Sequence, residues 1–104
     1  MIFPLLSIAL PVLAGEPLPP AKAAELVRLV RQDCGSCHGM TLQGGLGSPL
    51  TREALGDKPA ENLAFTILHG RPGTAMPPWK SLLSGTEADW IAQRLLQGFP
   101  EEGR

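Results

Sequence analysis

Two cysteines and a histidine stand within five residues, in the segment Cys34-Gly35-Ser36-Cys37-His38. This is the C-x-x-C-H pattern by which a c-type haem is covalently attached. On one helical turn, cysteines three residues apart place both thiols on the same side, where they can form thioethers with the two vinyl groups of a porphyrin. The imidazole of His38 can then bind the iron as proximal ligand. The motif therefore predicts one covalent haem c, attached through Cys34 and Cys37.

Two other kinds of site also use a C-x-x-C pair. A thioredoxin-like dithiol requires a βαβ context, which the sequence lacks. A zinc site requires a second pair of ligands, and His69 is the only further histidine in the chain. The sequence therefore favours haem over both alternatives.

The N-terminal segment predicts export. Residues 2–13 form an apolar run broken by two prolines, and Val12-Leu13-Ala14 offers small residues suited to a signal peptidase. We predict a signal peptide over residues 1–14, cleaved near Ala14, although no lysine or arginine precedes the run. An uncleaved anchor is disfavoured because a spanning helix needs roughly 20 apolar residues. We therefore expect a periplasmic protein with no stable membrane insertion after cleavage.

What remains is one small domain. Residues 15–19 read as a linker and residues 20–104 as a single haem-binding domain. About 90 residues support only a thin core, so a covalently held haem would supply apolar surface that the side chains cannot. The sequence has no basic patch or aromatic-interleaved basic run, so no nucleic-acid partner is expected.

The first predicted helix delivers the cysteines. Pro20 suits the first turn of a helix that runs to about Asp33. Apolar residues recur along it at helical spacing, and the same stripe continues to Cys34 and Cys37. The stripe consists of Ala23, Leu26, Val27 and Val30.

A glycine-rich loop follows the histidine. Residues 39–50 contain four glycines and one proline, which excludes regular structure and lets the backbone approach a porphyrin closely. A ligating histidine donates its second N–H to an acceptor, and a backbone carbonyl near Pro49 is the candidate. A simple turn proline is the alternative, and the sequence does not choose between them. Leu50 is expected to pack on the haem ring.

Two helices are predicted in the middle of the chain. Thr51 can cap a short helix through Leu55, ended by Gly56, and a second helix runs from about Pro59 to His69, with Gly70 at its boundary. Its apolar stripe consists of Ala60, Leu63, Ala64 and Ile67, widened by Phe65 and Leu68. Its narrow polar stripe consists of Asn62, Thr66 and His69. We expect His69 to face solvent rather than to act as a second axial ligand.

The segment 71–79 holds the sixth-ligand candidate. Two prolines follow Met76, so the backbone there is extended and stiff, and a thioether is a soft, neutral iron ligand. Met1 is removed with the signal, and Met40 is tied close to His38 on the proximal side. Met76 is therefore the predicted distal ligand, and a gap-filling core methionine is the disfavoured alternative. Trp79 could donate its indole N–H to a haem propionate or only pack in the core, and both readings stay open.

The last predicted helix opens with Ser84-Gly85-Thr86-Glu87, a capping box, and Gly98 and Pro100 stop it. Its core stripe consists of Ala88, Ile91, Ala92 and Leu95. The two alanines of this stripe predict a close crossing over the first helix. Trp90 on the flank is expected to pack.

With these motifs in place, residues 20–99 resemble the class I c-type cytochromes. The shared features are an N-terminal helix into C-x-x-C-H, a glycine-rich loop with Pro-Leu, a middle helix, a methionine loop and a C-terminal helix. The resemblance implies an all-α fold whose first and last helices cross around one haem with an exposed edge. It also implies thioether roles for Cys34 and Cys37, a proximal role for His38 and a distal role for Met76.

Residues 34–47 and 67–79 are similar, more closely, to the small periplasmic cytochromes encoded with haem-cd nitrite reductase in denitrifying bacteria. That similarity implies electron donation to the nitrite reductase, or a part in making its d-type haem. We expect a single-electron carrier and no enzyme, because no side-chain pair resembles a catalytic acid and base. The alternatives are an assembly factor for nitrite reductase or its haem, and a ligand-binding haem protein, which the methionine loop disfavours.

Overall fold

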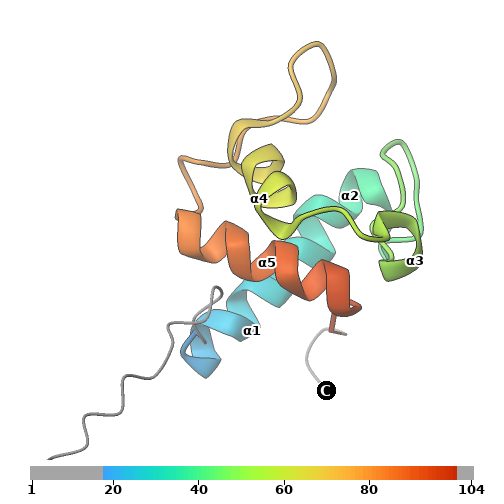
Figure 1. Cartoon of the computed structure of the whole chain (residues 1–104). Coiled ribbons are helices and arrows are strands. Elements are labelled where there is room, and N and C mark those ends of the chain that lie inside the picture. The colour runs from blue at the N-terminus through green and yellow to red at the C-terminus, as the bar shows by residue number, and fades with distance from the viewer. Residues whose placement is uncertain (1–17, 101–104) are drawn as a thin grey trace, which may run out of the picture.

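The computed structural model of the chain describes residues 18–100, and within that range every regular element is a helix. Figure 1 shows their arrangement. The elements are α1 (Pro20–Leu29), the π-helical turn η1 (Val30–Cys34), α2 (Gly35–His38), α3 (Arg52–Leu55), α4 (Ala60–His69) and α5 (Gly85–Gln97). The predicted signal peptide, residues 15–17 of the linker and residues 101–104 lie outside the described range. No helix between residues 18 and 100 is long and apolar enough to cross a membrane.

The first helix is longer than its sequence predicted. It begins at Pro20 as expected, but it continues past Asp33 through η1 and α2 to His38. At the π-turn, the backbone N–H of Gly35 donates to the carbonyl of Val30, five residues earlier. A π-turn accommodates one residue more than an α-helical turn. The haem motif is therefore part of the helix, separated from the core stripe by one extra residue.

The predicted helix ends are confirmed where a local signal sets them. The Thr51 hydroxyl accepts a hydrogen bond from the Ala54 N–H at 3.2 Å, which caps α3. Ser84 and Glu87 form both hydrogen bonds of a capping box, at 3.1 and 2.8 Å. Gly70 ends α4 at φ +70°, a conformation that favours glycine. These ends depend on neighbouring residues alone, which is why the sequence predicted them.

The core lies between α1 and α5, which Figure 1 shows crossing. Its buried apolar side chains come mainly from these two helices, with one residue each from the glycine-rich loop of residues 39–50 (the proximal loop), α3 and the turn before α5. They are Leu26, Val27, Val30, Leu42, Leu55, Leu83, Trp90, Ile91 and Leu95. Lys22 on α1 also pairs with Glu87 on α5 at 3.4 Å. The predicted crossing of the first and last helices is therefore confirmed.

The prediction for the two alanines of α5 is wrong. Ala88 and Ala92 pack with Ala64 of α4 in a separate small cluster, rather than against α1. Small side chains let two helices approach closely, and α5 uses that property toward α4. The larger residues Trp90, Ile91 and Leu95 cover the side toward α1. Helix α5 is therefore apolar on two faces, and the stripe alone could not tell which neighbour each face meets.

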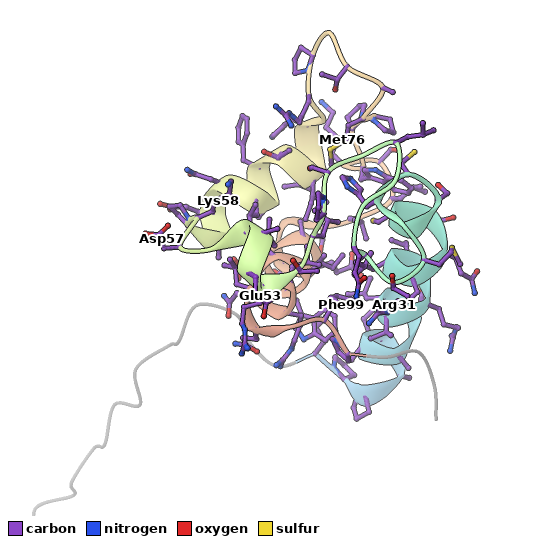
Figure 2. The ribbon with its side chains drawn as sticks, turned by 90° about the vertical axis from the view of Figure 1, so that its right-hand side faces the viewer. Arg31, Glu53, Asp57, Lys58, Met76 and Phe99 are labelled. Carbon is purple, nitrogen blue, oxygen red and sulfur yellow. The ribbon has the colours of Figure 1, made fainter. Side chains whose placement is uncertain are left out.

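The C-terminal end of the described chain is held by Arg31. Its guanidinium donates to the carbonyls of Phe99 and Pro100 at 2.9 to 3.2 Å and lies 5.5 Å from the centre of the Phe99 ring. Figure 2 shows the two labelled residues side by side. The Phe99 ring in turn meets Trp90 edge to face at 6.4 Å. This contact links the end of the chain to the helix that carries the haem motif.

Candidate haem site

The π-turn sets which residues of the motif face the core. Val30 and Gly35 are both buried, one π-turn apart, while Cys34 is half-buried and Cys37 is exposed. A side chain at Gly35 would meet the Met40 backbone and sulfur at 3.5 and 3.6 Å. These are ordinary van der Waals contacts, so space alone does not require glycine at this position; both cysteines line an adjoining cavity.

Burial raises the pKa of the Cys34 thiol to about 11, with smaller contributions from Asp33 and Cys37. At neutral pH this sulfur is therefore protonated in the polypeptide. A zinc site or a redox dithiol needs a stabilised thiolate, whereas a thioether sulfur is neutral. The described residues also contain no group of three or more His, Cys, Asp or Glu that could hold a metal ion. The environment of Cys34 is that expected for a thioether.

His38 is oriented by the backbone of the proximal loop. Its Nδ1 lies 2.7 Å from the carbonyl oxygen of Ser48. A carbonyl only accepts hydrogen bonds, so Nδ1 carries the proton and Nε2 is left with a free lone pair. This is the arrangement typical of a metal-ligating histidine. The predicted acceptor near Pro49 is the carbonyl of the residue just before that proline.

Glycines allow the proximal loop to lie close to Cys37 and His38. A Cβ at Gly47 would stand 2.7 Å from the His38 Nδ1, and one at Gly45 would stand 2.7 Å from the Cys37 carbonyl oxygen. The Gly47 N–H donates to that Cys37 carbonyl at 2.7 Å, and the Gly44 N–H donates to the His38 carbonyl at 2.8 Å. The loop therefore satisfies the last carbonyls of α2 while it orients the imidazole.

Two adjoining cavities of about 300 and 400 Å³ open beside the motif. Both lie within the size range of cofactor pockets, about 300–1,000 Å³. They share a set of lining residues, namely Cys34, His38, Ser48, Arg71 and Met76. Cys37, Leu46 and Trp79 line only the first cavity, and Leu50, Leu63 and Ile67 line only the second. The structure thus brings Met76 to the same space as the cysteines and His38, across 38 residues of sequence.

The other predicted site residues separate into two groups. Leu50 and Trp79 line the cavities, but the Pro49 ring does not, and it packs near Gly44 instead. His69 is exposed and stacks on Phe65 with ring centres 4.4 Å apart, so the expected solvent-facing histidine is confirmed. It lines neither cavity.

Sequence reasoning missed one wall of the second cavity. Lys58, Asn62 and Thr66, from α4 and the residues before it, line this wall. Asn62 and Thr66 were grouped with His69 as one polar stripe, but the structure separates them from it. A polar stripe on a helix predicts that this face is not packed in the core. The stripe alone does not show whether the face meets solvent or a cofactor cavity.

The site fits a haem on three observations. The Cys34 thiol is removed from solvent, and His38 presents a free ring nitrogen. The backbone at Gly47 lies so close to the His38 ring that an added Cβ would clash with it. A soft thioether at Met76 lies across the same space. Cys34 and Cys37 would hold the group, and His38 and Met76 would ligate its iron.

Comparisons with known proteins give the family. Residues 21–93 match the family described as cytochrome c oxidase, cbb3-type, subunit III. A cytochrome c55X from Stutzerimonas stutzeri is 48% identical over 101 residues, which cover 97% of this chain and 83% of that protein. The chain belongs to the cytochrome c55X family of c-type cytochromes.

The solved structure of a c-type cytochrome NirC is similar to this chain, with a TM-score of 0.75 and 52% sequence identity. The match covers 77% of this chain and 94% of that one. A dihydro-heme d1 dehydrogenase from Pseudomonas aeruginosa is 37% identical over 98 residues, 94% of this chain but only 20% of the dehydrogenase. Members of the family carry a covalent haem c, so the cofactor and the class I fold predicted from the sequence are confirmed.

Proposed function

We propose that the chain is a periplasmic single-electron carrier, rather than an enzyme, that serves nitrite reduction. In it, Cys34 and Cys37 bind the haem through thioethers, and His38 and Met76 are the axial ligands. The observation that carries this proposal is the convergence of these four side chains on one space, with the His38 Nδ1 already engaged by Ser48. When bound, the haem supplies reversible one-electron chemistry at its iron.

The chain's own residues explain how the iron of a bound haem would be ligated and kept from water. The Ser48 carbonyl fixes the imidazole and makes it a stronger donor. Leu50, Leu63 and Ile67 form an apolar wall of the second cavity, which would exclude water from the iron of a bound haem. With both His38 and Met76 bound to it, the iron would have no open position for a substrate, which suits a carrier.

Covalent attachment can be tested directly on the purified periplasmic protein. Acid-acetone extraction releases a haem held only by ligation, but not one held by two thioethers. We expect the haem to stay with the polypeptide. Haem that moves into the acetone phase would overturn the attachment at Cys34 and Cys37.

Nitrite reductase is the proposed electron acceptor. The loops that border the first cavity carry little charge: residues 39–46 have none, and residues 71–79 have only Arg71. Leu46 at this rim is 96% exposed. Such a contact should be small, apolar and short-lived, with little electrostatic steering.

The acceptor is tested by mixing the reduced cytochrome with haem-cd nitrite reductase and nitrite at several ionic strengths. Fast reoxidation with a shallow salt dependence supports the donor role. No electron transfer, combined with tight and stable binding, would contradict it and favour an assembly role.

A second candidate function follows from the similarity to the dihydro-heme d1 dehydrogenase. A domain like this chain is fused there to a larger protein whose name describes an oxidation, so this chain could accept electrons in the maturation of a d-type haem. Oxidising one dihydro-haem releases two electrons and two protons, so two molecules of the carrier would be reduced. The test supplies the oxidised cytochrome to such a dehydrogenase and its substrate, and reduction at this ratio supports the candidate.

A further inference from the structure

Four polar residues of the second cavity come from α4 and its two ends, while His38 and Ser48 line it from the motif and the proximal loop. Asn62 and Thr66 are one turn apart on α4, Lys58 stands two residues before that helix, and Arg71 stands two residues after it. Figure 2 shows Lys58 near one end of α4 and Met76 near the other. The remaining walls of this cavity are formed mainly by aliphatic side chains. The cavity therefore has one cationic, hydrogen-bonding wall.

The two cations on this wall are not engaged elsewhere. Within residues 18–100, neither the Lys58 ammonium nor the Arg71 guanidinium forms an ion pair, and the Asn62 side-chain amide has no hydrogen-bond partner. Apart from Arg28 and Lys80, which also lack a partner, the other lysines and arginines of residues 18–100 have one. They are Lys22 with Glu25 and Glu87, Arg31 with two carbonyls, Arg52 with Glu53, and Arg94 with Gln97.

Covalent chemistry fixes which edge of a haem would face this wall. The vinyl groups and the two propionates occupy opposite edges of the porphyrin, so cysteines that hold the vinyls direct the propionates away from themselves. Cys37 lines only the first cavity, together with Asp33 and Trp79, whereas Lys58 and Asn62 line only the second. Cys34 and Arg71 line both cavities, so only Lys58 and Asn62 are separated from the Cys37 side, on which Asp33 lies.

We propose that Lys58 and Arg71 bind the two haem propionates, with the Asn62 amide donating a hydrogen bond to one of them. A carboxylate next to a partly dry cavity is costly unless a cation or donor faces it, and this wall supplies both. Trp79 lines the cysteine side alone, so it is the poorer propionate partner. This inference rests on the proposed haem attachment through Cys34 and Cys37.

The proposal has a consequence for the reduction potential. Positive charge near the iron favours the reduced state, because oxidation adds a positive charge to the haem. Removing either cation should therefore lower the potential while leaving the axial ligands in place. A residue with a merely structural role would change stability without this shift.

The experiment measures the midpoint potential of purified holoprotein for Lys58→Met and Arg71→Gln. Lys80→Met and Arg28→Gln are the matched controls, because these exposed cations line neither cavity. At fixed solution potential, we expect each cavity variant to lower the ratio of reduced to oxidised protein by about threefold to tenfold, where tenfold equals 59 mV for one electron. Lys58→Arg and Arg71→Lys should restore the wild-type ratio.

Cavity variants that match their controls would overturn the assignment, and so would failure of the charge-conserving variants to restore the ratio. Covalent haem in each preparation, measured as stain on a denaturing gel, separates this outcome from failure of the proposed function. If Lys58→Met yields too little protein, Lys58→Gln provides the same loss of charge. Loss of haem from the wild-type protein itself would instead contradict the proposed attachment.

Discussion

The two loops on either side of the haem site are built differently. The proximal loop, residues 39–50, is fixed by backbone hydrogen bonds to the motif, and its Leu42 is buried in the main core. The distal loop, residues 71–79, is exposed except at Met76 and Trp79, and its hydrogen bonds are mostly internal. Figure 1 shows this loop projecting from the helices between α4 and α5. Of the two proposed axial ligands, His38 is thus positioned by hydrogen bonds to the rest of the fold, whereas Met76 lies in a loop with few anchors.

The anchors of the distal loop lie at its ends. The N–H groups of Trp79 and Lys80 donate to the carbonyls of Ile67 and Leu68 at 3.1 Å, which ties the loop to the end of α4. The Arg71 N–H donates to the Met76 carbonyl at 3.2 Å across its neck. We infer that His38 keeps its orientation without the iron, whereas Met76 depends on the iron–sulfur bond to hold the loop in place.

The largest effect is expected when the haem cannot be attached, because both loops then lose their contact with it. Cys34→Ala with Cys37→Ala should leave little folded protein, because a small domain loses both a covalent link and a large part of its core. The measurement is the yield of soluble protein and its helical circular dichroism. A stable, fully helical double variant would show that the helices alone support the fold.

Removing Met76, the proposed distal ligand, should leave the fold intact but leave the sixth coordination position of the iron open. In Met76→Ala we expect the far-red sulfur-to-iron band of the oxidised form to disappear, small ligands to bind, and the potential to fall, because Met/His ligation raises it. Absorption spectra with and without carbon monoxide check this. An unchanged spectrum would identify another sixth ligand, and Met40→Ala is the matched control on the proximal side.

A pair of glycine variants sharpens the contrast between the loops. A Cβ at Gly47 would press on His38 at 2.7 Å, whereas one at Gly73 has no heavy atom within 4 Å, although its φ is +79°. Gly47→Ala should cost about 1–3 kcal/mol and shift the potential as the imidazole turns. Gly73→Ala should cost only about 1–2 kcal/mol of backbone strain and leave the potential unchanged. Equal potentials in both variants would contradict the proximal-loop argument.

The smallest effect concerns the start of α5, which follows the distal loop. Ser84→Ala should lower the free energy of unfolding by about 1 kcal/mol through loss of a helix cap, without altering the iron–sulfur band. Chemical unfolding and the absorption spectrum measure the two quantities. A weakened band would mean that the helix start helps to hold Met76.

The same cap predicts a pH dependence. The backbone hydrogen bond from Ser84 is the main factor that lowers the pKa of the Glu87 carboxyl, with Lys22 contributing less. A pKa that is lower in the folded state gives stability that is present above the unfolded pKa and lost as pH falls through the folded value. The difference in stability between wild type and Glu87→Gln should therefore be largest near neutral pH and shrink in acid.

Local signals explain what the sequence predicted well. The cap at Thr51, the box at Ser84 and the stop at Gly70 each depend on residues within a few positions, so spacing suffices. The histidine acceptor could be placed near Pro49 for the same reason, because the loop from His38 is short. The prediction that the motif and segment 71–79 line one site rested on chemistry, because histidine and methionine together ligate haem iron.

Tertiary choices explain the rest. The alanines of α5 were assigned to the wrong neighbour because a helix apolar on two faces does not reveal which partner meets which face. Asn62 and Thr66 looked like a solvated stripe because the haem, which is absent from the sequence, is what they would face. The extension of the first helix to His38 was missed because a π-turn carries no residue signature of its own.

The π-turn sets the direction in which the haem motif faces relative to the apolar stripe of the same helix. An α-helix rotates by about 100° per residue, so one inserted residue turns everything downstream by that angle unless the helix absorbs it. At Val30–Cys34 the helix does absorb one. Without the extra residue of this turn, a regular α-helix would rotate the attachment motif by about 100° relative to the apolar stripe upstream. A transplanted C-x-x-C-H on a regular helix would need the same offset, or its thiols would point about 100° away from the porphyrin.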